Sequence, residues 1–389
     1  MSGLLRARVA VVGAGPAGLV LANVLHRSGI DVLVIEQRSR QAVETTPRAG
    51  LVEHRVVAYL RQWGLADELL RDATWHGWCD IVVSGERIRL DYAARAGGDR
   101  HCVYPQQLLL RDLLGALDEA DRAPRFDSAV LDVDLTSATG ARLRCAEFEA
   151  ECDFVIGCDG ARSVVSRSFP GSPDGDVRRR YPYDWLTMLA DLTAPVEGIR
   201  YAVHERGFAG MMPRAGRLGR LYLQVPADED LARWPAARLH EELGVRLGAD
   251  AGIVEIREPG ILRMRSSIAR TSRHGRAFLA GDAAHVLTPS GAKGMNLAIA
   301  DAADLARSLV RWYRHDDATG LAGYGERRRS QARHALGFSE ELLHLLHLPP
   351  DAADPAAELR SRRAQVQRLT GETPEAERFA RDYVGSGRL

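Results

Sequence analysis

The segment GAGPAG (13–18) has the residue types and spacing of a phosphate-binding turn. Gly13 permits a tight turn, Gly15 lets a pyrophosphate approach the backbone, and Gly18 lets a helix pack closely on a strand. The N-terminus of that helix then faces the phosphates, and Glu36 is placed to hold a ribose diol. The alternative is a chance glycine-rich turn. We therefore predict a dinucleotide site, although this motif alone does not distinguish FAD from NAD.

The elements around this turn agree with the prediction. Residues 8–12 are a β-branched run typical of a buried parallel strand, and the pattern predicts a helix over 16–27 and a second strand over 31–36. This βαβ order is the setting that a dinucleotide-binding turn needs.

Two further segments bring a carboxylate to the end of a strand. GDAAH (281–285) follows the short apolar run AFLA, and GCDGARS (157–163) follows FVI. Asp282 and Asp159 would then lie beside the middle of a bound cofactor. Each segment, taken alone, also fits an ordinary turn between a strand and the next element.

The remaining chain predicts an α/β protein in three parts. Residues 1–180 are expected to form a Rossmann-like FAD-binding domain with a parallel sheet, including helix over 51–71 and a hairpin over 80–92. Residues 181–270 predict a substrate domain with a mixed or antiparallel sheet. Residues 271–389 begin with the Gly-Asp segment, which is expected to pack in the FAD-binding domain. They end in helices that are expected to form a helical or interface region.

The composition excludes several classes of function. The formal net charge is zero, which favours neither nucleic acid nor an anionic membrane as a partner. Five cysteines without metal-ligand spacing indicate reduced thiols, a cytoplasmic protein and no metal. The apolar run from Val9 to Leu25 contains three glycines and leads directly into another strand, so it is not interpreted as a signal peptide. Lys293 is the only lysine among 52 basic residues.

Taken in order, the three glycine segments resemble the 4-hydroxybenzoate 3-monooxygenase family of single-component FAD-dependent aromatic hydroxylases. The resemblance extends along nearly the whole chain. It is carried by PRAG (47–50), VYPQ (103–106), GCDG (157–160), YPYDWL (181–186), YAVHERGFAGMMPRAGRLGRLYLQ (201–224), GDAAHVLTPSGAKGMNLA (281–298) and DYVG (382–385).

The resemblance implies a proton path and a substrate pocket. Tyr201 is similar to the tyrosine that binds the substrate phenol, Tyr383 to its relay partner, and His76 to the residue that exchanges the proton with solvent. The Pro289 carbonyl is expected to face the phenol. Arg214 and Tyr222 resemble carboxylate anchors. The expected pocket also includes three other residues, Trp185, Gly210 and Met212.

The resemblance also implies how FAD and the nicotinamide cofactor bind. The expected FAD-binding residues are Gly13, Gly15, Ala17, Gly18, Glu36, Arg48, Gln106, Asp159, Arg220, Asp282, Lys293 and Asn296. The chain has no second GxGxxG, and NADPH or NADH is expected to use Arg38, Arg162 and Arg167 instead. The implied reaction uses O2 and a flavin C4a-hydroperoxide to hydroxylate a small aromatic acid beside its phenol. A homodimer is also expected.

The chain departs from the family in its pocket. Met212 replaces a serine that helps to bind the carboxylate, and Gly210 replaces a leucine of the wall. Arg162 replaces a histidine, and Gln37-Arg38 differs from the usual Arg-Gln pair. We expect Gly210 to open volume, so that the substrate is 4-hydroxybenzoate or a ring-substituted relative such as 3-amino-4-hydroxybenzoate.

Each assigned residue also has an ordinary structural interpretation. Tyr201 and Tyr222 could be half-buried strand tyrosines, Arg214 and Arg220 could be surface arginines, and His76 could be structural. Only the shared register of 201–224 favours the functional interpretation. For the whole chain, the alternatives are another FAD oxidoreductase or a non-catalytic FAD module. A flavin halogenase is set aside because the spacing of Trp75 and Trp78 differs from that of the tryptophan motif (W-x-W-x-I-P) in that class.

Overall fold

A computed structural model describes residues 3–48, 50–171, 177–214, 216–349 and 352–389. Its first seven-stranded sheet has the order β18-β19-β10-β1-β2, and β9 and β8 extend from β10. β1 is parallel to both β2 and β10, and β10 is parallel to β19. The strands are β1 (Gly3–Val12), β2 (Val32–Ile35), β8 (Val130–Asp134), β9 (Ala141–Cys145), β10 (Phe148–Gly157), β18 (Arg273–His274) and β19 (Ala277–Leu279).

Helices bury one face of this parallel sheet. They share an apolar core with it and are α1 (Pro16–Arg27), α3 (His54–Gln62), α6 (Gln106–Glu119) and α9 (Lys293–His315). Apolar strands β1 and β2 pack against them, as expected for a sheet covered by helices. The other face has a second apolar core, which includes residues of β8, β9 and α7 (Val164–Arg167). The predicted βαβ unit is therefore confirmed, and the helix over 16–27 has the predicted bounds.

The second seven-stranded sheet has the order β16-β12-β15-β14-β13-β5-β6. Its strands are β5 (Trp78–Val83), β6 (Glu86–Asp91), β12 (Tyr183–Leu192), β13 (Ile199–Val203), β14 (Ala209–Pro213), β15 (Leu218–Pro226) and β16 (Ile253–Leu262). β5 and β6 form the predicted hairpin, yet they join this sheet from within segment 1–180. The three-part division by sequence order stays a prediction, and the second sheet draws on both of its first two segments.

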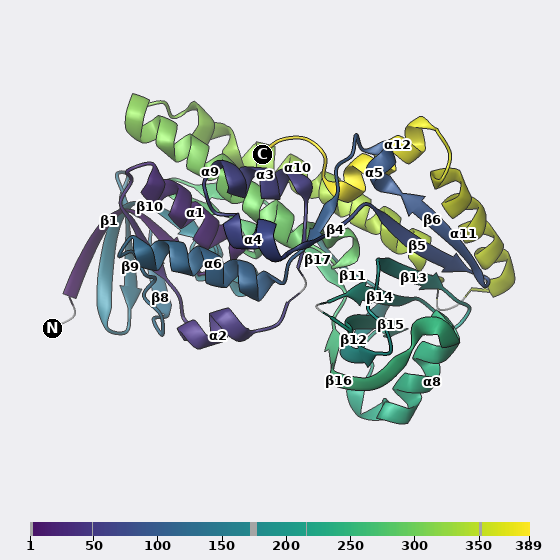
Figure 1. Cartoon of the computed structure of the whole chain (residues 1–389). Coiled ribbons are helices and arrows are strands. Elements are labelled where there is room, and N and C mark those ends of the chain that lie inside the picture. The colour runs from purple at the N-terminus through teal and green to yellow at the C-terminus, as the bar shows by residue number, and fades with distance from the viewer. Residues whose placement is uncertain (1–2, 49, 172–176, 215, 350–351) are drawn as a thin grey trace.

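The second sheet is covered differently on its two faces. α8 (Ala236–Leu247) packs on one face. The other face meets the C-terminal helices α10 (Thr319–Leu346), α11 (Pro355–Leu369) and α12 (Pro374–Val384). Figure 1 shows α11 and α12 beside β5 and β6, with α8 at the far edge of this half of the molecule. The face between the sheet and the C-terminal helices carries most of the predicted substrate residues.

Short elements connect the two halves. β3 (Leu51–Val52), β7 (His101–Val103) and β4 (Thr74–His76) form one small sheet, and β11 (Val177–Arg180), β17 (Arg265–Ile268) and β20 (His285–Val286) form another. The short helices are α2 (Arg40–Thr45), α4 (Asp67–Asp72) and α5 (Tyr92–Arg95). The expectation of continuous helix over 51–71 is wrong. Leu51 and Val52 pair with β7, and Gly64, at φ 64°, follows the end of α3 in the left-handed conformation.

No helix in the described ranges combines the length and apolar character needed to cross a membrane. The five cysteines are all free thiols. The described residues also contain no group of three or more His, Cys, Asp or Glu arranged to hold a metal ion.

Candidate active site

The turn between β1 and α1 is built so that only one of its glycines faces open space. A Cβ at Gly13 would lie 2.4 Å from the Cys158 carbonyl oxygen, and a Cβ at Gly18 would lie 2.0 Å from the Gly13 carbonyl oxygen. Gly13 also has φ +105°, which favours glycine. At Gly15 the nearest atom to a Cβ is the Cys158 oxygen, 4.0 Å away. Gly15 therefore leaves the approach that a pyrophosphate needs at the start of α1.

Glu36 holds this turn from the neighbouring strand. Its Oε2 accepts a hydrogen bond from the Ala14 N–H at 2.7 Å, and its Oε1 accepts from the N–H and Nε of Arg38, each at 2.9 Å. The Glu36 side chain is buried. Arg38, which was assigned to NAD(P)H, is therefore placed against the acid that was assigned to the ribose of FAD.

The other two glycine segments meet the same turn. Gly13 lies against Cys158 and Asp159, and a Cβ at Gly281 would lie 3.6 Å from the Ala17 Cβ. Asp159 accepts a hydrogen bond from Val164 N–H through Oδ2, and its buried Oδ1 has no partner among the described residues. Burial raises the pKa of Asp159. The Asp282 side chain is exposed, but desolvation by surrounding protein raises its pKa too, while the neighbouring His285 and Arg48 lower it.

A buried aspartate, Asp301, fixes the Gly281-Asp282 turn, and sequence reasoning missed it. Its Oδ2 accepts from the Gly281 N–H at 2.8 Å and lies 2.7 Å from His285 Nε2, while its Oδ1 accepts from Arg328 Nε at 2.6 Å. The neighbouring His285 and Arg328 lower the pKa of Asp301 against the effect of its burial. Asp301 sits within α9, so only the folded chain brings it to the turn.

These features fit FAD. The open approach at Gly15, the unpartnered Asp159 oxygen and the accessible Asp282 carboxyl lie around one meeting point of three segments. The start of α9 adds a helix N-terminus, which favours negative charge. Gln106 begins α6 and is half-buried. Arg167 donates to the Arg162 carbonyl. The PRAG segment includes Ala49, which lies outside the described residues.

The predicted substrate residues share one face of the second sheet. Tyr201 of β13 pairs with Gly210 of β14, which pairs with Tyr222 of β15. Met212 and Arg220 pair with each other two residues further along the same strands. Because side chains alternate along a strand, all five positions point to the face that meets the C-terminal helices.

Tyr201 and Tyr383 form the core of the predicted proton path. Their hydroxyl oxygens are 2.9 Å apart, and both side chains are buried. Burial raises the pKa of both phenols well above the ordinary value. A proton passing along this pair would therefore move through neutral hydroxyls, because neither tyrosine can easily hold a negative charge.

His76, the predicted end of the path, does not contact Tyr383 through any hydrogen bond or ring contact between the described residues. Its ring lies 3.5 Å from Thr74 Oγ1, and burial lowers its pKa. Tyr92 and His101 lie against Tyr383 instead, with ring centroids 4.9 and 5.1 Å from that of Tyr383. Tyr92 donates to the His76 carbonyl at 3.0 Å, and His101 is the cross-strand partner of His76.

His101 is a buried neutral imidazole beside the tyrosine pair. Desolvation is the largest effect on its pKa, which falls to about 3, and Lys293 lowers it further. Its Nδ1 is 3.4 Å from the Tyr92 hydroxyl, and its Nε2 lacks a hydrogen-bond partner among the described residues. Nothing in the sequence around His101 distinguishes it from a structural histidine, so sequence reasoning did not find it.

Arg214 is a half-buried cation without an acidic partner among the residues that the structure describes. It lies at the end of β14, and the hydrogen bond of its guanidinium goes to the Pro213 carbonyl, at 3.2 Å. Burial lowers its pKa, and Arg220 lowers it further, whereas Tyr222 raises it. A guanidinium in this state suits a carboxylate ligand, which would supply the missing negative charge.

Lys293 and Asn296 connect α9 to other segments. Lys293 Nζ donates to Glu53 Oε1 at 2.7 Å and to the Tyr383 carbonyl at 2.9 Å. Asn296 accepts from Glu53 N–H and donates to the carbonyls of Leu51 and Ala292. Both residues were assigned to FAD. The structure places their polar groups on protein partners, so they would act on the flavin through the segments that they hold.

The structure corrects one expected pocket residue and refines two others. Gly210 was expected to open volume, and this is wrong, because a Cβ there would lie 2.8 Å from Phe208 Cζ. The Phe208 ring therefore fills the space that Gly210 leaves. Trp185 stacks on Phe208 with ring centroids 4.9 Å apart, so it supports the Phe208 ring. The Pro289 carbonyl accepts a hydrogen bond from Ala292 N–H at 3.0 Å, which leaves one lone pair for a ligand.

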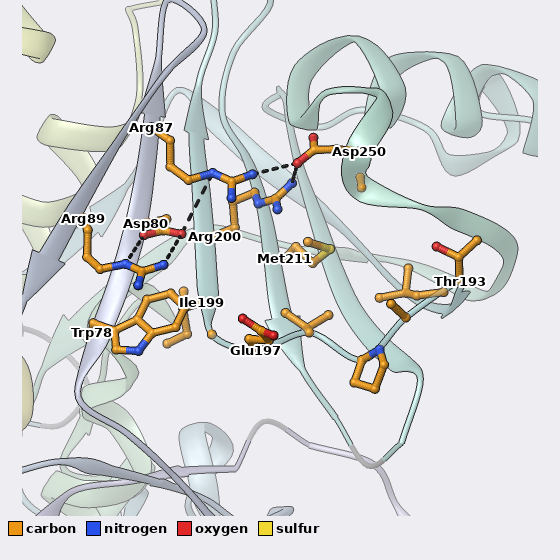
Figure 2. A pocket seen from close by; sticks show the side chains of 16 residues that line it. Trp78, Asp80, Arg87, Arg89, Thr193, Glu197, Ile199, Arg200, Met211 and Asp250 are labelled. Carbon is orange, nitrogen blue, oxygen red and sulfur yellow. Dashed lines mark hydrogen bonds and ion pairs between the residues drawn. The ribbon is translucent and has the colours of Figure 1, made fainter.

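A separate cleft of about 200 Å³ lies beside β5, β6 and β13, on the sheet face opposite Tyr201. Figure 2 shows its arginines directed toward carboxylates. Arg87 and Arg200 lie 2.7 and 3.1 Å from Asp250, and Arg89 lies 2.9 Å from Asp80. Because these cations are already paired, this cleft is a weaker candidate for an aromatic acid than the face with Arg214.

Comparison with known proteins identifies the family of this chain. Residues 6–339 match the family described as an FAD binding domain. The chain is 32% identical to p-hydroxybenzoate hydroxylase from Acinetobacter baylyi over 388 residues, covering 98% of this chain and 96% of that protein. It is 29% identical to aklavinone 12-hydroxylase RdmE from Streptomyces purpurascens, covering 89% of this chain and 70% of that protein.

Solved structures share the fold. A ternary complex of aklavinone-11 hydroxylase with FAD and aklavinone superposes with a TM-score of 0.76 at 26% identity, covering 89% of this chain and 70% of that one. A p-nitrophenol 4-monooxygenase from Pseudomonas putida DLL-E4 gives a TM-score of 0.82 at 21% identity over all of both chains. The predicted fold, FAD cofactor and enzyme class are thereby confirmed, and the chain belongs to the family of FAD-dependent aromatic hydroxylases, flavoprotein monooxygenases that use NAD(P)H and O2.

Proposed function

We propose that this enzyme hydroxylates a 4-hydroxybenzoate-type acid at the ring carbon next to the phenol. The observation that carries the proposal is the pairing of two features on one sheet face. Arg214 is a cation without an acidic partner in the described ranges. The hydroxyl of Tyr201 is buried and hydrogen-bonded to that of Tyr383. A substrate that carries both a carboxylate and a phenol satisfies both.

The carboxylate end is held by Arg214, with Tyr222 beside it. The positive charge of Arg214 is poorly solvated, since burial already lowers its pKa. A benzoate carboxylate would neutralise the charge of Arg214 and accept charge-assisted hydrogen bonds from it, which are stronger than neutral ones. Met212 contributes no hydroxyl to this end, and losing one neutral hydrogen bond costs about 1 kcal/mol, a several-fold effect.

The phenol end is activated by Tyr201. A free phenol has a pKa of about 10, so only about 1% is ionised at pH 8. Reduced FAD, when bound, activates O2 and supplies the oxygen atom that enters the ring. Tyr201 would accept the phenol proton as it passes its own to Tyr383, which leaves a more electron-rich ring carbon for that oxygen. The buried surroundings of both tyrosines keep water from the reacting groups.

The proton would leave the tyrosine pair towards His76, past the Tyr92 hydroxyl and the His101 imidazole. Burial lowers the pKa of His76, so its imidazole is neutral at neutral pH and would pass a proton on to solvent rather than hold it. We further propose that the enzyme is a cytoplasmic homodimer and that Arg38, Arg162 and Arg167 serve NADPH or NADH. 3-Amino-4-hydroxybenzoate is the alternative substrate, favoured by the apolar and flexible Met212 in the wall.

The proposal is tested by measuring substrate-stimulated NAD(P)H oxidation over a matched series, with product analysis. The series contains 4-hydroxybenzoate, its 3-amino derivative, 4-hydroxybenzyl alcohol without the carboxylate, and benzoate without the phenol. We expect coupled hydroxylation only with the phenolic acids, and with NADPH and NADH compared in parallel. Turnover of the alcohol as efficiently as the acids, or rejection of every phenolic acid, would contradict the proposal.

A further inference from the structure

The Phe208 ring lies over Gly210, between the two tyrosines that are proposed to contact the substrate. Gly210 is the direct cross-strand partner of both Tyr201 and Tyr222. A Cβ on Gly210 would lie 2.8 Å from Phe208 Cζ and 3.6 Å from Tyr222 Cδ2. The rings of Phe208 and Tyr201 have centroids 6.1 Å apart. The edge of Phe208 therefore occupies the middle of the wall that these tyrosines flank.

Other aromatic rings pack against Phe208. Trp185 stacks on it at 4.9 Å, and His347 lies 4.8 Å from it. His347 in turn stacks on Tyr183 at 4.4 Å, with an interplanar angle of 11°. All of these side chains are buried, and Phe208 is completely so. A ring packed on this many neighbours has little room to move when a larger substrate binds.

The hydrogen bonds of His347 fix the same stack. Trp185 Nε1 can only donate, so its 2.8 Å contact makes His347 Nε2 the acceptor. His347 Nδ1 then donates to the Leu343 carbonyl at 2.9 Å. Burial lowers the pKa of His347 to about 3, so the imidazole stays neutral and keeps this arrangement. The rings that pack against Phe208 are consequently anchored to α10.

We propose that Phe208 is a specificity-determining residue, which closes the β14 side of the pocket against substituents on the ring of the aromatic acid. Gly210 is its partner, because only a residue without a Cβ leaves room for the Phe208 ring. Met212 lies on the same face but is half-buried and flexible. A ring substituent can therefore be admitted on the side of the pocket where Met212 lies. This inference rests on the proposed function for the class of substrate.

The test compares two acids, 4-hydroxybenzoate and 3-methyl-4-hydroxybenzoate, in variants that change the wall. The measured quantity is the ratio of kcat/KM for the methylated acid to kcat/KM for the parent acid. Phe208→Leu should raise this ratio at least ten-fold by opening the wall. Phe154→Leu, a buried phenylalanine of the first sheet, is the matched control and should leave the ratio unchanged, whatever it does to stability.

A reciprocal change tests the partnership with Gly210. Gly210→Ala should reduce turnover of both acids by displacing the Phe208 ring. Phe208→Leu/Gly210→Ala should recover turnover of the parent acid, because the smaller side chain leaves room for the new methyl group. Such mutual suppression is not expected of two independent losses of stability. FAD absorbance and circular dichroism identify variants that have failed to fold.

The outcomes separate this inference from the proposed function. If the wild-type enzyme hydroxylates the parent acid but folded Phe208→Leu leaves the ratio unchanged, Phe208 does not set specificity and only this inference fails. If Phe208→Leu does not fold, Phe208→Met, whose flexible side chain adapts to a packed site, gives the ratio, with the same two results. If the wild-type enzyme hydroxylates neither acid, the proposed substrate class fails and the assignment of Phe208 falls with it.

Discussion

Lys293, the only lysine in the chain, donates a hydrogen bond to the backbone carbonyl of Tyr383, the residue whose hydroxyl meets that of Tyr201. Its second hydrogen bond goes to Glu53, which also accepts from Arg55 at 2.7 Å. The start of α9 is thereby joined to the end of α12. The cofactor half of the molecule and the proposed proton path share this buried ion pair.

Glu53→Gln should destabilise the protein strongly. Glu53 is fully buried, and its loss leaves Lys293 without a counter-charge, which costs about 3 to 5 kcal/mol in buried pairs. Urea unfolding measures the change in the free energy of unfolding. Glu326→Gln is the control, since Glu326 pairs with Arg329 at an exposed site and such pairs contribute about 0 to 1 kcal/mol. Equal small losses in both variants would contradict a stabilising role for the Lys293–Glu53 pair.

The buried carboxylates also predict that the protein loses stability at acidic pH. The pKa of Glu53 is lowered from 4.5 and that of Asp301 from 3.8, despite burial, because cations lie beside them. A lowered folded pKa gives stability that is complete above the unfolded pKa and is lost as the pH falls through the folded pKa. The free energy of unfolding should therefore fall below about pH 4.5. The same titration of Glu53→Gln should show a shallower fall, and an unchanged slope would exclude Glu53 as a source of it.

Gly15→Val should abolish FAD retention while the fold survives. The added side chain enters the open approach to the α1 N-terminus, where the pyrophosphate is expected. The ratio of flavin to protein absorbance after gel filtration measures retention. Gly115→Val, in α6 with nothing within 4 Å of its Cβ position, is the control and should stay yellow. Full FAD retention in Gly15→Val would mean that the pyrophosphate lies elsewhere.

Arg214→Ala should raise the KM for a phenolic acid with little loss of FAD. Truncating one partner of a buried charge pair costs about 2 to 5 kcal/mol, and the half-buried setting of Arg214 favours the lower end. Arg214→Lys should recover only part of the affinity, because an ammonium lacks the guanidinium fork. Arg217→Ala changes an exposed arginine of the same hairpin and should leave KM unaltered. If the two alanine variants behave alike, Arg214 is not the carboxylate anchor.

The parts of the site that could be read from sequence are those encoded by neighbouring residues. The Gly13–Gly18 turn combines its strand, glycines and helix within one short segment, and the structure places them as predicted. The Tyr201–Tyr383 pair is different, since 182 residues separate its members. Family resemblance suggested that pair, and no local pattern encodes it.

The residues that sequence reasoning missed depend on tertiary packing. Asp301 reaches the Gly281 turn from within a long helix, and His101 reaches Tyr383 of α12 from a strand of a small sheet. The effect of Gly210 was misjudged because a missing side chain was taken to leave empty space. In a close-packed interior a neighbour fills such space, and here the neighbour is Phe208, the residue just before β14.

The most direct measurement is the ratio of hydroxylated product to NAD(P)H consumed, with hydrogen peroxide measured in parallel, for the wild-type enzyme and Tyr201→Phe acting on 4-hydroxybenzoate. Tyr59→Phe, in α3, is the matched control. Losing general acid–base assistance costs roughly 10² to 10⁴ in rate, so Tyr201→Phe should bind FAD and substrate yet release mostly peroxide. The wild-type and Tyr59→Phe enzymes should give a ratio near that of full coupling. A Tyr201→Phe enzyme that remains fully coupled would contradict the proposed ionisation of the phenol through Tyr201 and Tyr383.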